Sequence, residues 1–291
     1  LLSSGSLVST LLDLPTLEHD GFRWFGAQLP IGLGVFGHLA HDLRTGTALV
    51  YRELDGTPSL TDTTDEIHQV LVQDASGAET LWWLKPAAGE DHKEWRGVAA
   101  QSGVLRSYAT AYLDRILGFG VVPETLLIQS EQHGLASLQA HAPLPGRDPG
   151  AYAVTDGQQL AILDYLTAAG DRHELNWLTS SSGRPAAIDN GIAFTTPERG
   201  MIRSAFVESY FRPRLDQGLL DQVGAVDRRL LVSNLDQLGF DPLEVAYTLR
   251  RFDELVTRHA ITGENWGGTM LRGNALHLWG PRADGTREWW E

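Results

Sequence analysis

Hydrophobic and polar positions alternate along the first half of the chain, whereas apolar residues recur at helical spacing in much of the second half. An alternation of period two predicts strands, because successive side chains of a strand point to opposite faces. Five strands are expected on this basis, over residues 48–54, 67–72, 79–84, 124–129 and 134–139. The Ser76-Gly77 pair is typical of a turn, so the second and third strands should form a hairpin.

Helical spacing predicts one helix among the strands and several beyond them. The first covers residues 92–117, is interrupted near Ser102-Gly103 and ends at Gly118, a residue suited to a helix C-terminus. A Pro- and Gly-rich stretch at residues 143–150 is interpreted as a hinge. The helices expected after it cover residues 158–169, 202–208, 215–224, 228–237 and 242–259.

This order of elements predicts an α+β fold with two lobes. Residues 1–46, rich in Gly and Leu, should form an N-terminal extension packed on the domain. Residues 47–141 should form a small β-rich N-lobe and residues 142–291 a mainly α C-lobe, the two making one catalytic domain. The Trp-rich C-terminal segment should pack back on this body, because an exposed aromatic end would be sticky.

The charge and the apolar runs of the chain limit its partners and location. A formal net charge of −14, from 23 basic and 37 acidic side chains, is unsuited to neutralising DNA or RNA, so we expect no nucleic-acid partner. No apolar run approaches the roughly 18–20 residues that span a bilayer, so we expect no transmembrane segment. The absence of cysteine fits the cytoplasm and a disulfide-free exported protein equally, and we expect a cytoplasmic protein with export as the alternative.

The most informative passage for chemistry lies between two predicted helices. Asp171 is followed by Asn176, then by a short hairpin with a Ser-Gly tip, and then by an apolar strand that delivers Asp189 before Gly191. Phosphoryl transfer requires a carboxylate that orients the acceptor hydroxyl, together with an Asn and a second Asp that hold metal ions on the ATP phosphates. The passage contains all three side chains at the spacing of a kinase catalytic loop.

Lys85 is a further candidate for phosphate binding. Only Lys85 and Lys93 are lysines among the 23 basic side chains, and arginine does not replace a compact ammonium group at every site. Lys85 ends the apolar strand segment Leu-Trp-Trp-Leu, where its side chain should point either into a cleft or to solvent. Within this layout we favour the functional interpretation.

Three segments of the chain resemble a known group of kinases. The segments DRHELNWL (171–178) and AIDNGIAF (187–194) resemble the atypical kinases related to phosphatidylinositol 3-/4-kinases, actin-fragmin kinase and the secretory casein kinase. The stretch YLDRILGFGVVPETLL (112–127) is similar to a segment of their bacterial relatives. The resemblance covers about residues 81–194 and implies a bilobal protein kinase-like fold with an ATP site between the lobes.

The resemblance also implies roles for individual residues. Asp171 would be the catalytic base, Asn176 and Asp189 would bind Mg²⁺ or Mn²⁺, and Lys85 would contact the α- and β-phosphates of ATP. Leu138-Gln139 would follow the adenine edge as the connector between the lobes.

The loop that covers the phosphates should lie between the first and second predicted strands. Gly56, Thr57 and Ser59 in that segment offer backbone amides and hydroxyls that could cradle phosphate groups. A Gly-x-Gly-x-x-Gly pattern at residues 32–37 also matches a glycine-rich loop. It lies too far before Lys85 for adjacent strands, and we interpret it as a chance match.

One departure from the family pattern leaves alternatives open. The family pairs its strand lysine with a helix glutamate, but the corresponding region here reads Arg106-Ser107-Tyr108, so Glu94 or Glu90 would have to take that role. We predict an ATP- and metal-dependent kinase that transfers the γ-phosphoryl group to a hydroxyl of a protein or a small polar molecule. The alternatives are a catalytically silent pseudokinase that binds nucleotide as an interaction module, and transfer of AMP on the same fold.

Overall fold

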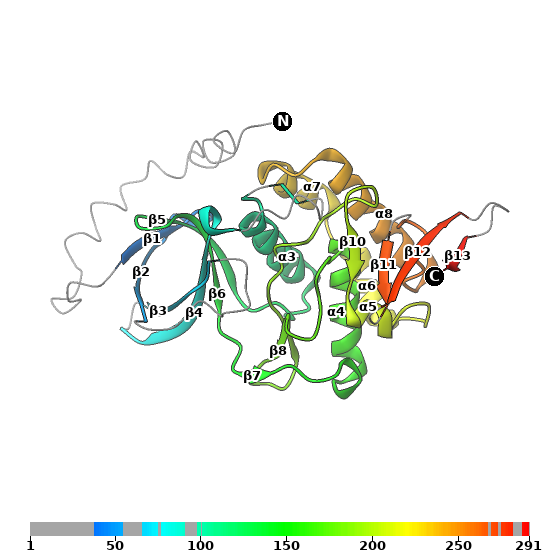
Figure 1. The fold of residues 1–291 in the computed structure, drawn as a ribbon, viewed down its shortest axis with the longest axis horizontal. Coiled ribbons are helices and arrows are strands. Elements are labelled where there is room, and N and C mark those ends of the chain that lie inside the picture. Colours follow the sequence, from blue (N-terminus) through cyan, green and yellow to red (C-terminus); the bar gives the residue numbers. More distant parts are fainter. Residues whose placement is uncertain are drawn as a thin grey trace. The chain divides into compact units, whose positions relative to one another are not determined.

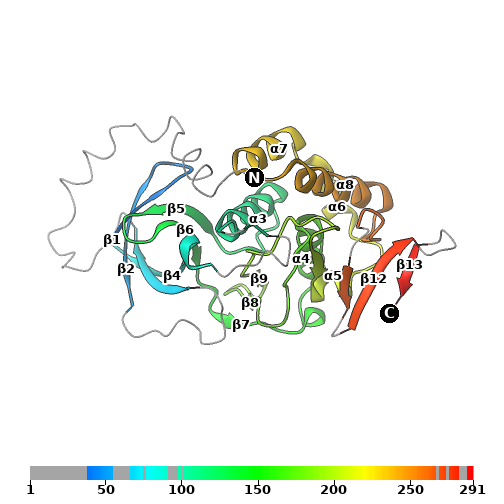
Figure 2. The same cartoon turned by 45° about the horizontal axis from the view of Figure 1, so that its top comes forward.

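The computed structural model describes residues 38–54, 66–74, 77–90, 98–99 and 101–266, and the backbone of three strands over residues 269–272, 275–281 and 287–290. The chain divides into two compact units, drawn as ribbons in Figures 1 and 2. The first unit comprises Leu1–His92, Ala100–Tyr108 and Glu124–His141. The second unit comprises Lys93–Ala99, Ala109–Pro123 and Ala142–Glu291.

Six antiparallel strands of the first unit close into a barrel, coloured blue to green in Figure 1. They are β1 (His38–Asp42), β2 (Ala48–Glu53), β3 (His68–Gln73), β4 (Glu79–Pro86), β5 (Thr125–Ser130) and β6 (Gly134–Ala140). The hydrogen-bonded order is β1-β2-β3-β4-β6-β5, and β1 closes the barrel by pairing with both β2 and β5. Closure gives every strand a partner on both sides. A short 3-10 turn, Ala87–Gly89, follows β4.

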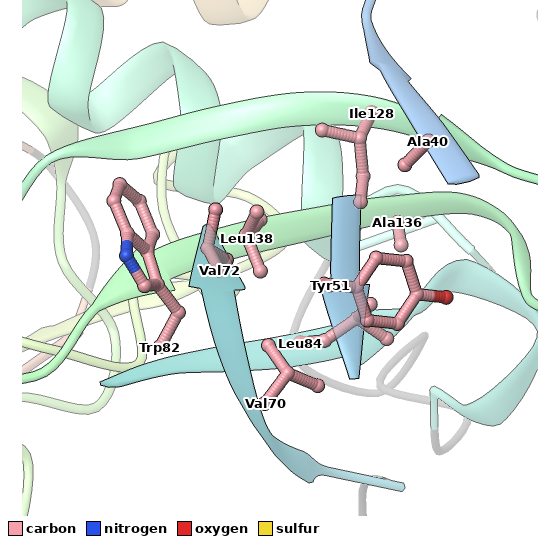
Figure 3. Packing of buried hydrophobic residues seen from close by; sticks show 9 residues of the cluster. All are labelled: Ala40, Tyr51, Val70, Val72, Trp82, Leu84, Ile128, Ala136 and Leu138. Carbon is pink, nitrogen blue, oxygen red and sulfur yellow. The ribbon is translucent and has the colours of Figure 1, made fainter. Parts of the chain in front are cut away.

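Alternate side chains of the strands fill the barrel, which explains the period-two pattern of the sequence. Figure 3 shows this cluster, which consists of Ala40, Tyr51, Val70, Val72, Trp82, Leu84, Ile128, Ala136 and Leu138. The hydroxyl of Tyr51 lies 2.8 Å from Ser130 Oγ, so the polar end of this buried ring is satisfied. Burial of each large apolar side chain contributes about 1.5–3 kcal/mol.

The predicted bilobal protein kinase-like fold is wrong. The first unit is a closed barrel of six strands instead of a five-stranded lobe, and the described residues of the second unit form two further sheets beside the helices. The strand that closes the barrel, β1, falls within the residues expected to form an N-terminal extension. It places the small Ala40 in the core, with His38 and Asp42 on the same face, so no apolar alternation marks it as a strand.

The five strands expected from the alternation are confirmed, with bounds that differ by no more than two residues. The expected pairing of these two strands as a hairpin is also confirmed, because β3 pairs antiparallel with β4, and Ser76 of the turn lies outside the described residues. The helix α3 (Gly103–Leu117) begins where the expected interruption lies. Residues 92–97 and 100 of that expected helix lie outside the described residues.

The second unit combines helices with two small sheets. Its longer helices confirm four predicted ones and are α4 (Val154–Thr167), α6 (Gln217–Ala225), α7 (Arg228–Gln237) and α8 (Pro242–Arg258). One sheet has the order β7 (Leu144–Pro145), β8 (Trp177–Thr179), β9 (Pro185–Ala187), and a 3-10 turn, Pro149–Ala151, precedes α4. The other has the order β10 (Met201–Arg203), β11 (Thr269–Arg272), β12 (Ala275–Pro281), β13 (Arg287–Trp290), and its last two strands are the red pair of Figure 2.

None of the helices that the structure describes has the length and apolar character of a membrane span.

The helix expected over residues 202–208 is wrong in its first part. Its first residues belong to the strand β10, and α5 (Ala205–Ser209) begins only after Ser204. The Ser204 hydroxyl oxygen accepts a hydrogen bond from Val207 N at 3.1 Å, which makes Ser204 the N-cap of α5. The change from strand to helix therefore takes place at Ser204, whose hydroxyl also donates to the buried Asp164 carboxylate of α4.

Two buried charged side chains of α8 hold the end of α4. Arg251 donates to the Leu166 carbonyl from Nε at 3.1 Å and from Nη2 at 2.9 Å. Glu254 accepts a hydrogen bond from the Tyr165 hydroxyl at 2.8 Å and binds the loop that follows α8. Because the end of α4 leads into the segment from 168 to 176, α8 helps to position the candidate site.

Candidate functional site

The loop from Asp171 to Asn176 is held in one conformation by its own hydrogen bonds. Asn176 Nδ2 donates to the Asp171 carbonyl at 2.7 Å, and Asn176 N donates to the His173 carbonyl at 2.8 Å. A flipped amide would place its oxygen against the Asp171 carbonyl, so this contact sets the orientation of the Asn176 side chain. Within the described part of the chain, no hydrogen bond uses Asn176 Oδ1, which leaves this oxygen available as a metal ligand.

Arg172 connects this loop to the strand end that carries Asp189. Its Nη1 donates to the carbonyls of Asn176, at 2.7 Å, and Ile188, and its Nη2 donates to Asn190 Oδ1. Ile188 N in turn donates to the Asn176 carbonyl at 3.1 Å. Asp189 therefore lies between two residues bound by the same guanidinium group, and its backbone is held beside that of Asn176.

The positive charge of Arg172 is balanced by Asp164 of α4. Arg172 Nε lies 3.2 Å from both carboxylate oxygens of Asp164, and Nη2 lies 3.1 Å from Oδ1. Ser204 Oγ donates to Asp164 Oδ2 at 2.7 Å. The two charged side chains are only 2% and 0% exposed, so their desolvation is offset by this dense set of hydrogen bonds.

Asp189 adopts an uncommon backbone conformation at the end of the predicted hairpin. The hairpin itself is confirmed, because β8 and β9 pair antiparallel around a turn that contains Gly183. Asp189 has φ +53°, in the left-handed region that Asp tolerates better than most residues. Such conformations cluster at functional sites, where the surroundings enforce them, and here Asn190 contributes by donating to the Ala187 carbonyl at 3.3 Å.

The carboxylate of Asp171 lies at the surface of this network. Its side chain is 17% exposed, and Arg203 Nη1 of β10 donates to Oδ1 at 3.0 Å. His173 Nε2 lies 3.9 Å from Oδ2. The ion pair with Arg203 orients the carboxylate, and the partial exposure leaves it accessible from solvent.

The segment that follows α3 supports β9 and so the position of Asp189. Ala187 N donates to the Val121 carbonyl at 2.7 Å. The buried carboxylate of Asp114 accepts hydrogen bonds from Val121 N and Val122 N, both at 3.1 Å. Burial raises the pKa of Asp114 to about 6, although these backbone hydrogen bonds oppose the effect.

The raised pKa of Asp114 should make stability depend on pH. The folded protein favours the neutral carboxyl group of Asp114. Its contribution to the free energy of unfolding is therefore fully present below about pH 4 and is lost as the pH rises through about 6. Relative to Asp114→Asn, the wild-type free energy of unfolding should fall by about 2–3 kcal/mol between pH 4 and 7. Urea unfolding of both proteins across this range measures the difference, and a pH-independent difference would contradict the expectation.

The structure places three predicted site residues in the first unit. Lys85 lies in β4 opposite Ser137, on the strand face that points away from the core residue Leu84. Leu138 and Gln139 are not part of a connector, because both lie within β6 and pair with β4 on one side and β5 on the other. The Leu138 side chain is fully buried in the barrel. Gln139 Nε2 donates to Thr125 Oγ1 at 2.9 Å.

The remaining predicted site residues lie outside the described residues. These are Gly56, Thr57, Ser59 and Glu94, and the Gly-x-Gly-x-x-Gly pattern at residues 32–37 lies outside them as well. Glu90, the other glutamate considered for Lys85, accepts hydrogen bonds from Gly103 N and Val104 N at the start of α3.

Sequence reasoning missed the residues that organise the site. They are Asp164, Arg172, Asn190, Arg203 and Ser204. One signal was present for Asp164, which is the single charged residue in the apolar stretch from 160 to 170 and therefore required a buried partner. In sequence comparisons the chain matches no protein-family model and no curated protein.

Proposed function

We propose that the second unit carries out metal-dependent phosphoryl transfer from ATP to a hydroxyl group. The observation that supports this most strongly is the position of Arg172, which binds the Asn176 carbonyl and both neighbours of Asp189. It ties together the two backbone segments that carry Asn176 and Asp189, the residues that the proposal needs for one metal ion. A Mg²⁺ or Mn²⁺ ion takes oxygen ligands from one or two protein side chains and completes its shell with phosphate oxygens and water.

Each side chain of the site has a defined role in this proposal. Asn176 Oδ1 and the Asp189 carboxylate would hold the ion, which supplies positive charge to the phosphates of the nucleotide. Asp171 would orient the acceptor hydroxyl and accept its proton as the new oxygen–phosphorus bond forms and ADP leaves. Arg203 would keep the Asp171 carboxylate in place. The proposal rests on residues of the second unit alone, and a contact of Lys85 with the α- and β-phosphates stays a prediction from the sequence.

A second candidate function is nucleotide binding without turnover. The ion pair between Asp171 and Arg203, at 3.0 Å, favours it because it gives the Asp171 carboxylate a structural role in joining the loop to β10. In that case the metal ligands would be retained while Asp171 served the structure. The acceptor of a transferred phosphoryl group would be a protein or a small polar hydroxyl compound, and AMP transfer stays a further alternative.

The test is ATP turnover by the full chain with Mg²⁺ and with Mn²⁺, with product analysis that separates ADP from AMP. Asp171→Asn should reduce turnover at least about 100-fold while nucleotide binding persists, since it removes the proton acceptor and leaves the metal ligands. Asp148→Asn is the matched control, because Asp148 is exposed and its side chain caps no helix. Binding without turnover in the wild type would favour the second candidate, and AMP as product would favour nucleotidyl transfer.

A further inference from the structure

One end of the barrel in the first unit brings together a carboxylate and two imidazoles. β2 ends at Glu53 and β3 begins at His68, and Glu53 pairs with Val70. Val70 belongs to the barrel core, so both Glu53 and His68 lie on the inward face of their strands. His133 reaches the same end from the turn between β5 and β6.

The three side chains already lie at the separations of metal ligands. His133 Nε2 lies 2.7 Å from Glu53 Oε1, and His68 Nδ1 lies 3.3 Å from Glu53 Oε2. Each residue offers one ligand atom such that all three atoms lie within 4.8 Å of one another. Zinc binds nitrogen and oxygen at about 2.0–2.1 Å, so tetrahedral ligands lie about 3.3 Å apart, and small side-chain shifts suffice.

The surroundings orient these side chains as the outer shell of a metal site does. His68 Nε2 lies 2.8 Å from Glu66 Oε1 while its Nδ1 faces Glu53, so Glu66 would accept the Nε2 proton when Nδ1 binds an ion. The turn that carries His133 is held by Ser130 Oγ, which accepts hydrogen bonds from the backbone amides of residues 132 and 133 at 3.1 Å. Ser130 is bound in turn to the buried Tyr51.

The charge of the cluster also suits a cation. A glutamate carboxylate is ordinarily ionised at neutral pH, so Glu53 supplies a negative charge beside the two imidazoles. Its side chain is 27% exposed, and those of His68 and His133 are 22% and 11% exposed, so an ion can reach the group from solvent.

We infer that Glu53, His68 and His133 form a binding site for a divalent transition-metal ion such as Zn²⁺, with Glu66 as the residue that orients His68. Two imidazoles and one carboxylate, with a further position open to water, are a ligand set that zinc accepts. Among the described residues, this is the one group of three or more histidine or acidic side chains with ligand spacing. The site lies within the first unit and does not depend on the phosphoryl transfer proposed for the second unit.

The experiment is a titration of the untagged, chelator-treated full chain with Zn²⁺ by calorimetry, with Co²⁺ absorption as a second readout. The wild type should bind one equivalent of ion at this site. His133→Gln and Glu53→Gln should each weaken binding by more than about 100-fold, because they remove a ligand. Glu66→Gln should weaken binding about 10–100-fold and change the Co²⁺ spectrum only slightly, because it removes an outer partner.

The matched control is His141→Gln, which removes an imidazole of the same unit that contacts the Trp83 indole instead of the cluster. It should bind Zn²⁺ as the wild type does. Thermal unfolding in the presence of chelator checks that each variant folds. If a ligand variant does not fold, Glu66→Gln still tests the site, because the Glu66 side chain is 53% exposed and its substitution should not disturb the fold. Failure of the wild type to bind Zn²⁺, or unchanged affinity in folded His133→Gln, would overturn the inference.

Discussion

Asp189→Asn should abolish metal-dependent nucleotide binding and reduce ATP turnover at least about 100-fold. The substitution keeps the size of the side chain and removes the charge that would face the metal ion, and such electrostatic contributions to phosphoryl transfer are large. Asparagine also tolerates the left-handed conformation that Asp189 adopts at φ +53°, so the backbone should not change. Calorimetric titration with nucleotide, with and without Mg²⁺, measures the effect directly.

The control for this prediction is Asp236→Asn, which removes an acidic charge from an exposed position of α7. It changes the net charge of the chain equally and should leave nucleotide binding unaltered. If Asp189→Asn retained Mg²⁺-dependent binding of normal affinity, Asp189 would not be a metal ligand and the proposed site would lose its main support.

The strands were predictable because their chemistry is local. In β3 and β4, large apolar side chains such as Val70, Trp82 and Leu84 alternate with polar or half-buried ones, and this period follows directly from the geometry of a strand. The closure of the barrel was not predictable in this way. It depends on β1, whose inward side chains are small or polar and whose partner β5 lies far along the chain.

The candidate site likewise combines residues whose spacing is visible in the sequence with contacts that form only in the folded chain. Asp171, Asn176 and Asp189 lie close together in the chain, and their spacing alone indicated a common function. Arg172 was adjacent to this motif, but its role depends on Asp164 of α4 and on Asn190, which approach it only in the folded chain.

The ligands of the proposed metal site are likewise brought together only when the chain folds. Glu53 and His133 are separated by 80 residues and form a contact only because the barrel closes. No spacing in the sequence relates the two residues, whereas motifs for metal binding usually place ligands a few positions apart.

Arg172→Met should be the most destabilising single substitution in the network around the site. Methionine has a similar length but no charge, so Asp164 would remain as a fully buried carboxylate without its ion-pair partner. Loss of one partner of a buried ion pair costs about 3–5 kcal/mol, and the carbonyls of Asn176 and Ile188 would lose a donor as well. Urea unfolding of the full chain measures the loss, and Arg258→Met, which removes an exposed ion pair with Glu264, should lower the free energy of unfolding far less.

A double substitution separates the charge of this pair from its packing. If the cost of Arg172→Met comes mainly from an uncompensated carboxylate, Arg172→Met with Asp164→Asn should be more stable than Arg172→Met alone, because no charge then remains buried. If the cost comes mainly from the lost hydrogen bonds to Asn176, Ile188 and Asn190, the second substitution should add to the first instead. In either case the loop and the Asp189 segment lose their common donor, so nucleotide binding should weaken in both variants. Retention of full stability and binding by Arg172→Met would show that Arg172 does not organise the site.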